Sequence, residues 1–137
     1  MKNWIVVAAL AALPLSAGAQ QFTMQESGGV RWVCGGVGEE ERDGLAALQS
    51  QANLSITSVA GKRGAYLADV QLALYDAKSK SPRLEIKTDG PICFIQATPG
   101  RYRIEASFNG VTRTASATAA AGATRPARVV LVFPEAE

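Results

Sequence analysis

Hydrophobic and polar residues alternate with a period of two along most of the chain between residues 53 and 133. This period is typical of half-buried strands, because successive side chains of a strand point to opposite faces. Glycine- and proline-containing turns separate the alternating runs. The alternating runs are residues 53–57, 68–74, 83–87, 101–108 and 111–119, and the wholly apolar segments 92–95 and 129–133 predict two more strands. They predict an all-β domain, a seven-stranded antiparallel β-sandwich.

Before these strands, residues 39–51 predict one short α-helix. Three acidic residues, Glu39 to Glu41, stand where the first turn of a helix favours negative charge. Leu45 and Leu48 follow at i, i+3 spacing. Gly44 costs about 1 kcal/mol relative to alanine inside a helix, so the helix needs tertiary packing. Residues 20–38 are expected to form a flexible arm that ends in a Gly-rich turn, with a short strand at 30–33.

The pair Asn109-Gly110 predicts a two-residue hairpin, since a type I′ turn needs positive φ at both central residues. This register places Ala106 opposite Arg113, on the apolar face of the sheet. We expect Arg113 to lie on an edge strand with its head reaching water. The alternative is that Arg113 binds an anionic ligand.

The first 19 residues predict a secretory signal peptide. Lys2 is followed by an apolar run from Trp4 to Leu15, and Ala17-Gly18-Ala19 matches a cleavage site. The run is shorter than the roughly 20 residues that span a bilayer. The mature chain is therefore expected to begin near Gln20 in the periplasm, with release outside the cell as the alternative, and without stable membrane insertion. An uncleaved membrane anchor is the alternative. The expected layout is a leader at 1–19, the arm at 20–38, and the helix plus sandwich at 39–134.

Composition narrows the chemistry of this 137-residue chain, which has 14 Lys plus Arg, 12 Asp plus Glu, two Cys and no His. Without histidine, a Ser-His-Asp triad and every His-based zinc site are excluded. Two cysteines are too few for a Cys-only zinc site. A formal net charge of +2 does not indicate a nucleic-acid partner. We expect neither a cofactor nor a metal.

Cys34 and Cys93 are expected to form a disulfide, because paired cysteines are usual in exported domains. In the apolar segment 92–95, Ile92 and Phe94 point one way, and Cys93 and Ile95 the other. We expect Ile92 and Phe94 to face the sandwich core. The predicted helix, which follows Cys34, would then cover Cys93 on the outer face. Two buried free thiols are the alternative.

An ordered set of motifs resembles the carboxypeptidase regulatory-like domains. Its members are Asp89-Gly90-Pro91, Pro99-Gly100-Arg101-Tyr102 and Asn109-Gly110, preceded by the strand-like segment 66–70. Gly35-Gly36-Val37-Gly38-Glu39-Glu40 is similar to the opening of a group of short proteobacterial exported proteins with this domain. The resemblance covers about residues 35–133. It implies a transthyretin-like, or prealbumin-like, sandwich that is generally non-catalytic.

The function predicted from these features is a non-catalytic periplasmic accessory or protein-interaction module, whose partner is an envelope or periplasmic protein. A small-ligand binder would need a pocket lined by the aromatic residues and Arg113. An uncharacterised hydrolase would need two carboxylates in one cleft, drawn from Asp69, Asp76, Glu85, Asp89 and Glu105.

The recognition surface is expected on loops, because loops on a rigid scaffold commonly carry function. One sandwich end is predicted to hold the turns 61–64, 89–91 and 99–100. The arm with Trp32 is the other candidate, and Tyr102 is expected to pack inside with its hydroxyl bonded to backbone. The candidate surface residues are Trp32, Lys62, Arg63, Asp89, Arg101 and Arg113.

Overall fold

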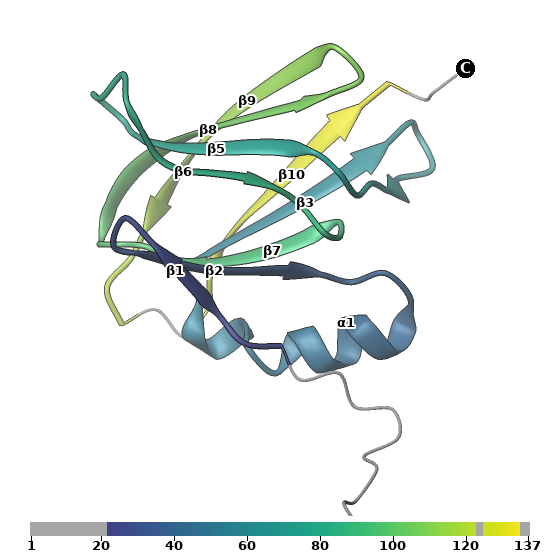
Figure 1. The fold of residues 1–137 in the computed structure, drawn as a ribbon, viewed down its shortest axis with the longest axis horizontal. Coiled ribbons are helices and arrows are strands. Elements are labelled where there is room, and N and C mark those ends of the chain that lie inside the picture. The colour runs from purple at the N-terminus through teal and green to yellow at the C-terminus, as the bar shows by residue number, and fades with distance from the viewer. Residues whose placement is uncertain (1–21, 123–124, 135–137) are drawn as a thin grey trace, which may run out of the picture.

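The computed structural model describes residues 22–122 and 125–134 (Figure 1). Strands make up 54% of it, against one α-helix of eight residues, so the all-β class is confirmed. No helix within the described ranges is both long and apolar enough to cross a membrane. The predicted signal peptide at 1–19 and the cleavage point before Gln20 lie outside these ranges.

Two sheets form the body of the protein. Sheet A has the order β1-β2-β7-β3-β10, with β4 paired to the end of β3, and sheet B has the order β6-β5-β8-β9. The strands of sheet A are β1 (Gln25–Ser27), β2 (Val30–Gly35), β3 (Leu54–Ala60), β4 (Ala65–Tyr66), β7 (Ile92–Gln96) and β10 (Ala127–Phe133). Those of sheet B are β5 (Gln71–Asp76), β6 (Pro82–Lys87), β8 (Gly100–Phe108) and β9 (Val111–Ala119).

The described residues thus contain ten strands rather than the seven predicted. Much of the segment predicted as a flexible arm is paired: β1 and β2 form an antiparallel hairpin, and β2 pairs with β7. Val30 and Val33 are buried. The partner of β2 lies about 60 residues further along the chain, so this pairing depends on a long-range contact that local alternation does not reveal.

At one edge of sheet A, β10 pairs with β3 in parallel, which differs from the antiparallel arrangement predicted. β10 runs beside β3 with Ala127 opposite Leu54 and Phe133 opposite Ala60. A half-buried strand alternates in the same way whichever direction its neighbour runs, so the sequence pattern did not distinguish the two.

The main hydrophobic core lies between the two sheets. Every second residue of the central strands enters it, as the period of two predicts. Each fully buried large apolar side chain contributes about 1.5–3 kcal/mol through the hydrophobic effect. The largest are Tyr102, Phe133, Leu54, Ile56, Leu74, Ile95 and Ile104.

A second, smaller core lies on the outer face of sheet A, beneath α1 (Glu39–Ala46). Figure 1 shows α1 alongside β2 at the lower edge of the molecule. Leu45 is fully buried against Val33 and Phe94. The predicted helix over 39–51 is shorter than expected, since α1 ends at Ala46 and a 3₁₀ turn, η1 (Gln49–Gln51), follows.

The hairpin predicted at Asn109-Gly110 is confirmed. Both residues have positive φ, 50° and 79°, and β8 and β9 pair with Phe108 opposite Val111 and Ala106 opposite Arg113. The strand predicted over 68–74 instead begins at Gln71, because Asp69 adopts a φ of 61° that interrupts extended backbone.

Candidate functional site

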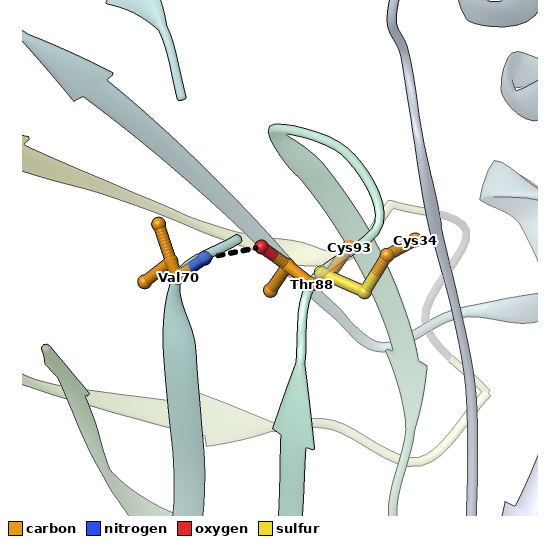
Figure 2. Close-up of a disulfide and its surroundings, with 4 residues drawn as sticks. All are labelled: Cys34, Val70, Thr88 and Cys93. Atoms are coloured by element: carbon orange, nitrogen blue, oxygen red, sulfur yellow. Dashed lines mark hydrogen bonds between the residues drawn. A yellow bond between two sulfur atoms is a disulfide. The ribbon is translucent and has the colours of Figure 1, made fainter. Parts of the chain in front are cut away.

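The disulfide between Cys34 and Cys93 is present, as predicted (Figure 2). The two residues lie directly opposite each other on β2 and β7, with 4.1 Å between their Cα atoms. A cross-link therefore ties the N-terminal hairpin to the middle of sheet A.

The faces of β7 are the reverse of those expected. Cys93 and Ile95 enter the main core, whereas Ile92 and Phe94 lie on the outer face with the second core. Alternation places Cys93 and Phe94 on opposite faces but does not say which face meets the helix. The larger Phe94 ring is the one that α1 covers.

Beside the disulfide, Thr88 joins the ends of β5 and β6 (Figure 2). Its hydroxyl accepts a hydrogen bond from the backbone N–H of Val70 at 3.0 Å, and its own N–H donates to the Val70 carbonyl. Thr88 is 2% exposed. Nearby, a Cβ on Gly90 would come within 2.4 Å of the backbone of Gly35, so this turn needs glycine for close approach.

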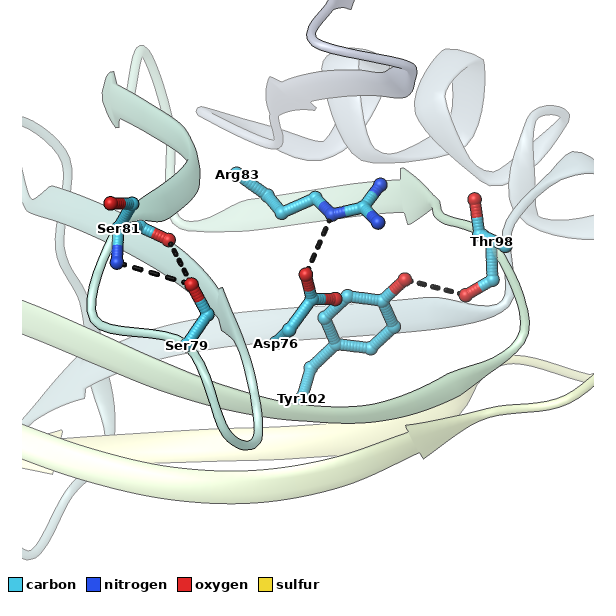
Figure 3. A network of polar contacts seen from close by, with 6 residues as sticks. All are labelled: Asp76, Ser79, Ser81, Arg83, Thr98 and Tyr102. Atoms are coloured by element: carbon cyan, nitrogen blue, oxygen red, sulfur yellow. Dashed lines mark hydrogen bonds and ion pairs between the residues drawn. The ribbon is translucent and has the colours of Figure 1, made fainter.

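A polar network surrounds Tyr102 at the opposite end of sheet B (Figure 3). The tyrosine ring is buried and its hydroxyl donates to the carbonyl oxygen of Thr98, which confirms the prediction for this residue. The Asp76 carboxylate lies between the ring and Arg83, and it accepts a hydrogen bond from Arg83 Nε at 2.9 Å.

Burial raises the pKa of the Tyr102 phenol above its ordinary value. Arg83 opposes this change and Asp76 adds to it. The hydrogen bond to Asp76 and its negative charge raise the pKa of the Arg83 guanidinium. The network therefore holds a neutral phenol beside the Arg83–Asp76 ion pair.

The turns predicted to share one end of the sandwich lie at two ends. Ser58 donates its N–H to the carbonyl of Pro91, so the turns 61–64 and 89–91 both lie near the C-terminal end of β3. The turn 99–100 lies beyond the other end of β7, near Asn53 at the start of β3. The prediction was wrong because β7 lies between the turns 89–91 and 99–100 and carries the chain from one end of the sandwich to the other.

The predicted surface residues are accordingly scattered. Lys62, Arg63 and Asp89 are exposed at one end, and Arg101 is exposed at the other. Trp32 is only half-buried in β2 and packs against the main core, with its indole N–H buried and unpaired among the described residues. It is therefore not an exposed anchor on a loose arm.

Arg113 closes the gap between the edges of the two sheets. It is exposed, and its Nε donates to the carbonyl oxygen of Val132 on β10 at 2.9 Å. This geometry agrees with the expected edge-strand role. Arg113 lines neither of the two cavities described below.

Two of the five candidate carboxylates, Glu85 and Glu105, do come to one place. Both are paired with Ala73 from opposite sides, on the outer face of sheet B, where a cavity of about 260 Å³ lies. Glu105 lies 3.4 Å from Arg103 Nε. Carboxylates and ion pairs are usual on the solvent face of a sheet, so this pair does not by itself define a catalytic site.

Exposed apolar side chains gather on the outer face of sheet A. Tyr66 and Val132 flank Val59 from β4 and β10, and Val130 is the next outward residue along β10. Tyr66, Val130 and Val132 are each about half exposed, at 53%, 48% and 50%. We call Val59, Tyr66, Val130 and Val132 the apolar strip.

The strip exists because α1 covers only part of this face. The helix packs on Val33 and Phe94 of β2 and β7, and the outward Val130 and Val132 of β10 stay exposed. At the boundary, the Arg42 guanidinium of α1 lies 5.4 Å from the centre of the Tyr66 ring. Clustered exposed apolar residues commonly mark an interaction site.

Next to the strip lies a cavity of about 430 Å³ that we call the arginine pocket. Its floor consists of outward side chains from β3 and β7, and its rim comes from η1 and the segment that enters β10. The lining residues are Gln49, Ser55, Thr57, Ile92, Phe94, Arg125, Pro126 and Arg128.

None of the polar residues of this pocket was predicted from the sequence as a site residue. Ser55 and Thr57 alternate with buried leucine and isoleucine on β3, the pattern of a half-buried strand. Every residue of β3 is in fact buried. The alternating hydroxyl residues Ser55 and Thr57 could have indicated a polar site if β3 had been known to lie inside the sheet. Only the strand order of the sheet shows this position.

Comparison of the chain with models of known protein families and with curated proteins gives no match.

Proposed function

We propose that this protein is an exported, non-catalytic accessory module that binds an envelope or periplasmic protein through the apolar strip. The proposal includes a prealbumin-like sandwich of the carboxypeptidase regulatory-like group and periplasmic location after removal of residues 1–19. The single observation that carries it is the row of exposed Tyr66, Val130 and Val132 on a sheet face that α1 leaves open.

Three features support the assignment to this group. The motif Pro99-Gly100-Arg101-Tyr102 leads into β8 and buries its tyrosine, Asn109-Gly110 forms the following hairpin, and the core lies between two sheets. The Cys34–Cys93 disulfide supports an oxidising compartment, since disulfides persist mainly outside the cytoplasm.

The strip suits a protein partner better than the loops do. Its side chains stand on paired strands, so their positions are fixed before binding and little conformational entropy is lost on association. The turn with Lys62 and Arg63 joins β3 to β4 directly beside the strip, which places two cations at its border. Charged residues around an apolar centre are typical of protein interfaces.

Site-specific photo-crosslinking in living cells tests the proposal. A photoreactive amino acid at position 132 is expected to give an adduct with one envelope or periplasmic protein. The same probe at Thr114, exposed on the outer face of sheet B, is the matched control and should give none. Substitution of Val130 by Asp should remove the adduct formed from position 132.

Equal adduct patterns from positions 132 and 114 would contradict a partner at the strip. So would the absence of any adduct when the probe at position 132 is the only change in the chain. Circular dichroism of each variant checks that the sheets are intact, so that a lost adduct reports on the surface.

A further inference from the structure

We propose that the arginine pocket binds a small organic anion, with its carboxylate or phosphate held by Arg125 and Arg128 and its apolar body on Ile92 and Phe94. This inference goes beyond the proposed function, because such a ligand needs no protein partner. The charge, the hydroxyl groups and the shape of the pocket support it.

The charge of the lining is one-sided. Two of the eight lining residues are arginines and none is acidic. Among the described residues, the two ion pairs are Arg83–Asp76 and Arg103–Glu105, so neither pocket arginine is neutralised by them. Guanidinium groups bind carboxylates and phosphates through charge-assisted, often paired hydrogen bonds.

The hydroxyl groups of Ser55 and Thr57 are the second feature. Both residues are 8% exposed on the central strand β3, and both line the pocket. Their hydroxyls take part in none of the side-chain hydrogen bonds found in the described ranges. They therefore remain free to donate to an oxyanion, as hydroxyl groups in ligand sites do.

The position of Arg128 brings these two features together. Arg128 is directly opposite Ser55 in the parallel pair of β10 and β3, and Ser55 is directly opposite Phe94 in the next pair. One row across the sheet thus presents a guanidinium, a hydroxyl and an aromatic ring. In the neighbouring row, the Thr57 hydroxyl lies between the aliphatic side chains of Val130 and Ile92.

The size of the pocket and its apolar floor indicate that the ligand has an apolar body attached to its anionic group. A cavity of about 430 Å³ lies within the range of about 300–1,000 Å³ that is common for small-molecule sites. An inorganic ion would leave the half-buried Ile92 and the small exposed part of Phe94 in contact with water. A molecule with an apolar body next to its anionic group would cover them, and this burial adds to binding.

Nuclear magnetic resonance titration of the ¹⁵N-labelled oxidised protein tests the inference. 3-Phenylpropionate and phenyl phosphate are the two anionic probes, and 3-phenylpropan-1-ol is the neutral analogue. We expect saturable shifts of the Ser55, Thr57 and Phe94 amides with an anionic probe and much weaker binding of the alcohol. The preferred anionic probe distinguishes a carboxylate ligand from a phosphate ligand.

Two variants and one control locate the binding. Arg128→Gln is expected to weaken binding about tenfold, through loss of a charge-assisted hydrogen bond. Thr57→Val removes the hydroxyl and should therefore weaken binding. It keeps the shape and β propensity of the side chain, so the fold should stay intact. Arg101→Gln, at an exposed arginine on sheet B, should leave the affinity unchanged.

The inference is overturned if neither anion saturates below about 10 mM, if the alcohol binds as well as the anions, or if Arg128→Gln and Arg101→Gln have equal effects. These results are independent of the crosslinking from position 132, so a failure of one proposal does not affect the other.

Discussion

At the scale of single residues, Tyr102 combines packing with a satisfied polar group. Its ring is among the largest fully buried side chains, and its hydroxyl reaches the carbonyl of Thr98 just before β8. A buried phenol without such an acceptor would be costly. The hydrogen bond therefore ties the loop between β7 and β8 to the main core.

Tyr102→Phe is expected to lower the free energy of unfolding by about 1 kcal/mol, because it removes this hydrogen bond and leaves the ring in place. Urea unfolding of the oxidised protein at neutral pH measures the change. Tyr66→Phe is the matched control, since Tyr66 is 53% exposed and should show little change. A Tyr102→Phe protein as stable as wild type would contradict the role assigned to the hydroxyl.

The same substitution has a predicted pH dependence. Burial raises the pKa of Tyr102 in the folded protein, so the contribution of the neutral phenol is complete below the unfolded pKa of about 10. It is lost as the pH rises through the higher folded pKa. Above about pH 10, wild type should therefore lose stability more steeply than Tyr102→Phe. Parallel curves for the two proteins would be inconsistent with the raised pKa.

At the scale of elements, the disulfide holds the N-terminal hairpin on sheet A. Cys34 and Cys93 are 59 residues apart in sequence and face each other across β2 and β7. β2 lies between β7 and β1, and β1 has only three residues, so β2 forms few backbone hydrogen bonds on that edge. The cross-link thus restricts the unfolded chain and places β2 in its register.

Reduction, or the double substitution Cys34→Ala/Cys93→Ala, is expected to lower the free energy of unfolding by up to about 4 kcal/mol in the chain-entropy model. Urea unfolding with and without reductant measures this loss. The double variant is the control and should not respond to reductant. A wild-type protein that is equally stable in both conditions would show that the bond adds nothing to the folded state.

At the scale of the whole molecule, α1 divides the outer face of sheet A into a covered and an open part. The covered part is the second core, and the open part carries the apolar strip and the arginine pocket. On sheet B, the outer face is polar, as shown by Gln71, Glu85, Glu105 and Ser107 around the smaller cavity. The molecule therefore has one face suited to recognition and another suited to water.

Export is the prediction that concerns the whole chain. Expressed with its first 19 residues in a Gram-negative host, the protein should accumulate in the periplasm with Gln20 as its first residue and the disulfide formed. Intact mass and N-terminal sequencing of the periplasmic fraction measure this. A chain that lacks residues 2–19 should stay in the cytoplasm as the control. An intact leader on the periplasmic protein would instead support a membrane anchor.

Much of the secondary structure follows from local sequence, because each signal needs only neighbouring residues. The Asn109-Gly110 turn sets the register of β8 and β9, including Ala106 opposite Arg113. The period of two marks β8 and β9, and a run of apolar residues marks β10, each to within two residues at either end. The helix start at Glu39 is equally local, whereas the helix end is not, since burial of Leu48 and Ala52 depends on the sheet beneath.

The amino-acid sequence is enough to predict an all-β chain, a hairpin turn at Asn109-Gly110 and the pairing of the two cysteines. Long-range contacts place Cys93 in the main core, set β10 parallel to β3 and put Arg128 beside Ser55. Alternation could not predict these arrangements, because it distinguishes two faces of a strand without identifying the neighbour of either face. Those neighbours come from segments distant in the chain, and they create both the strip and the pocket.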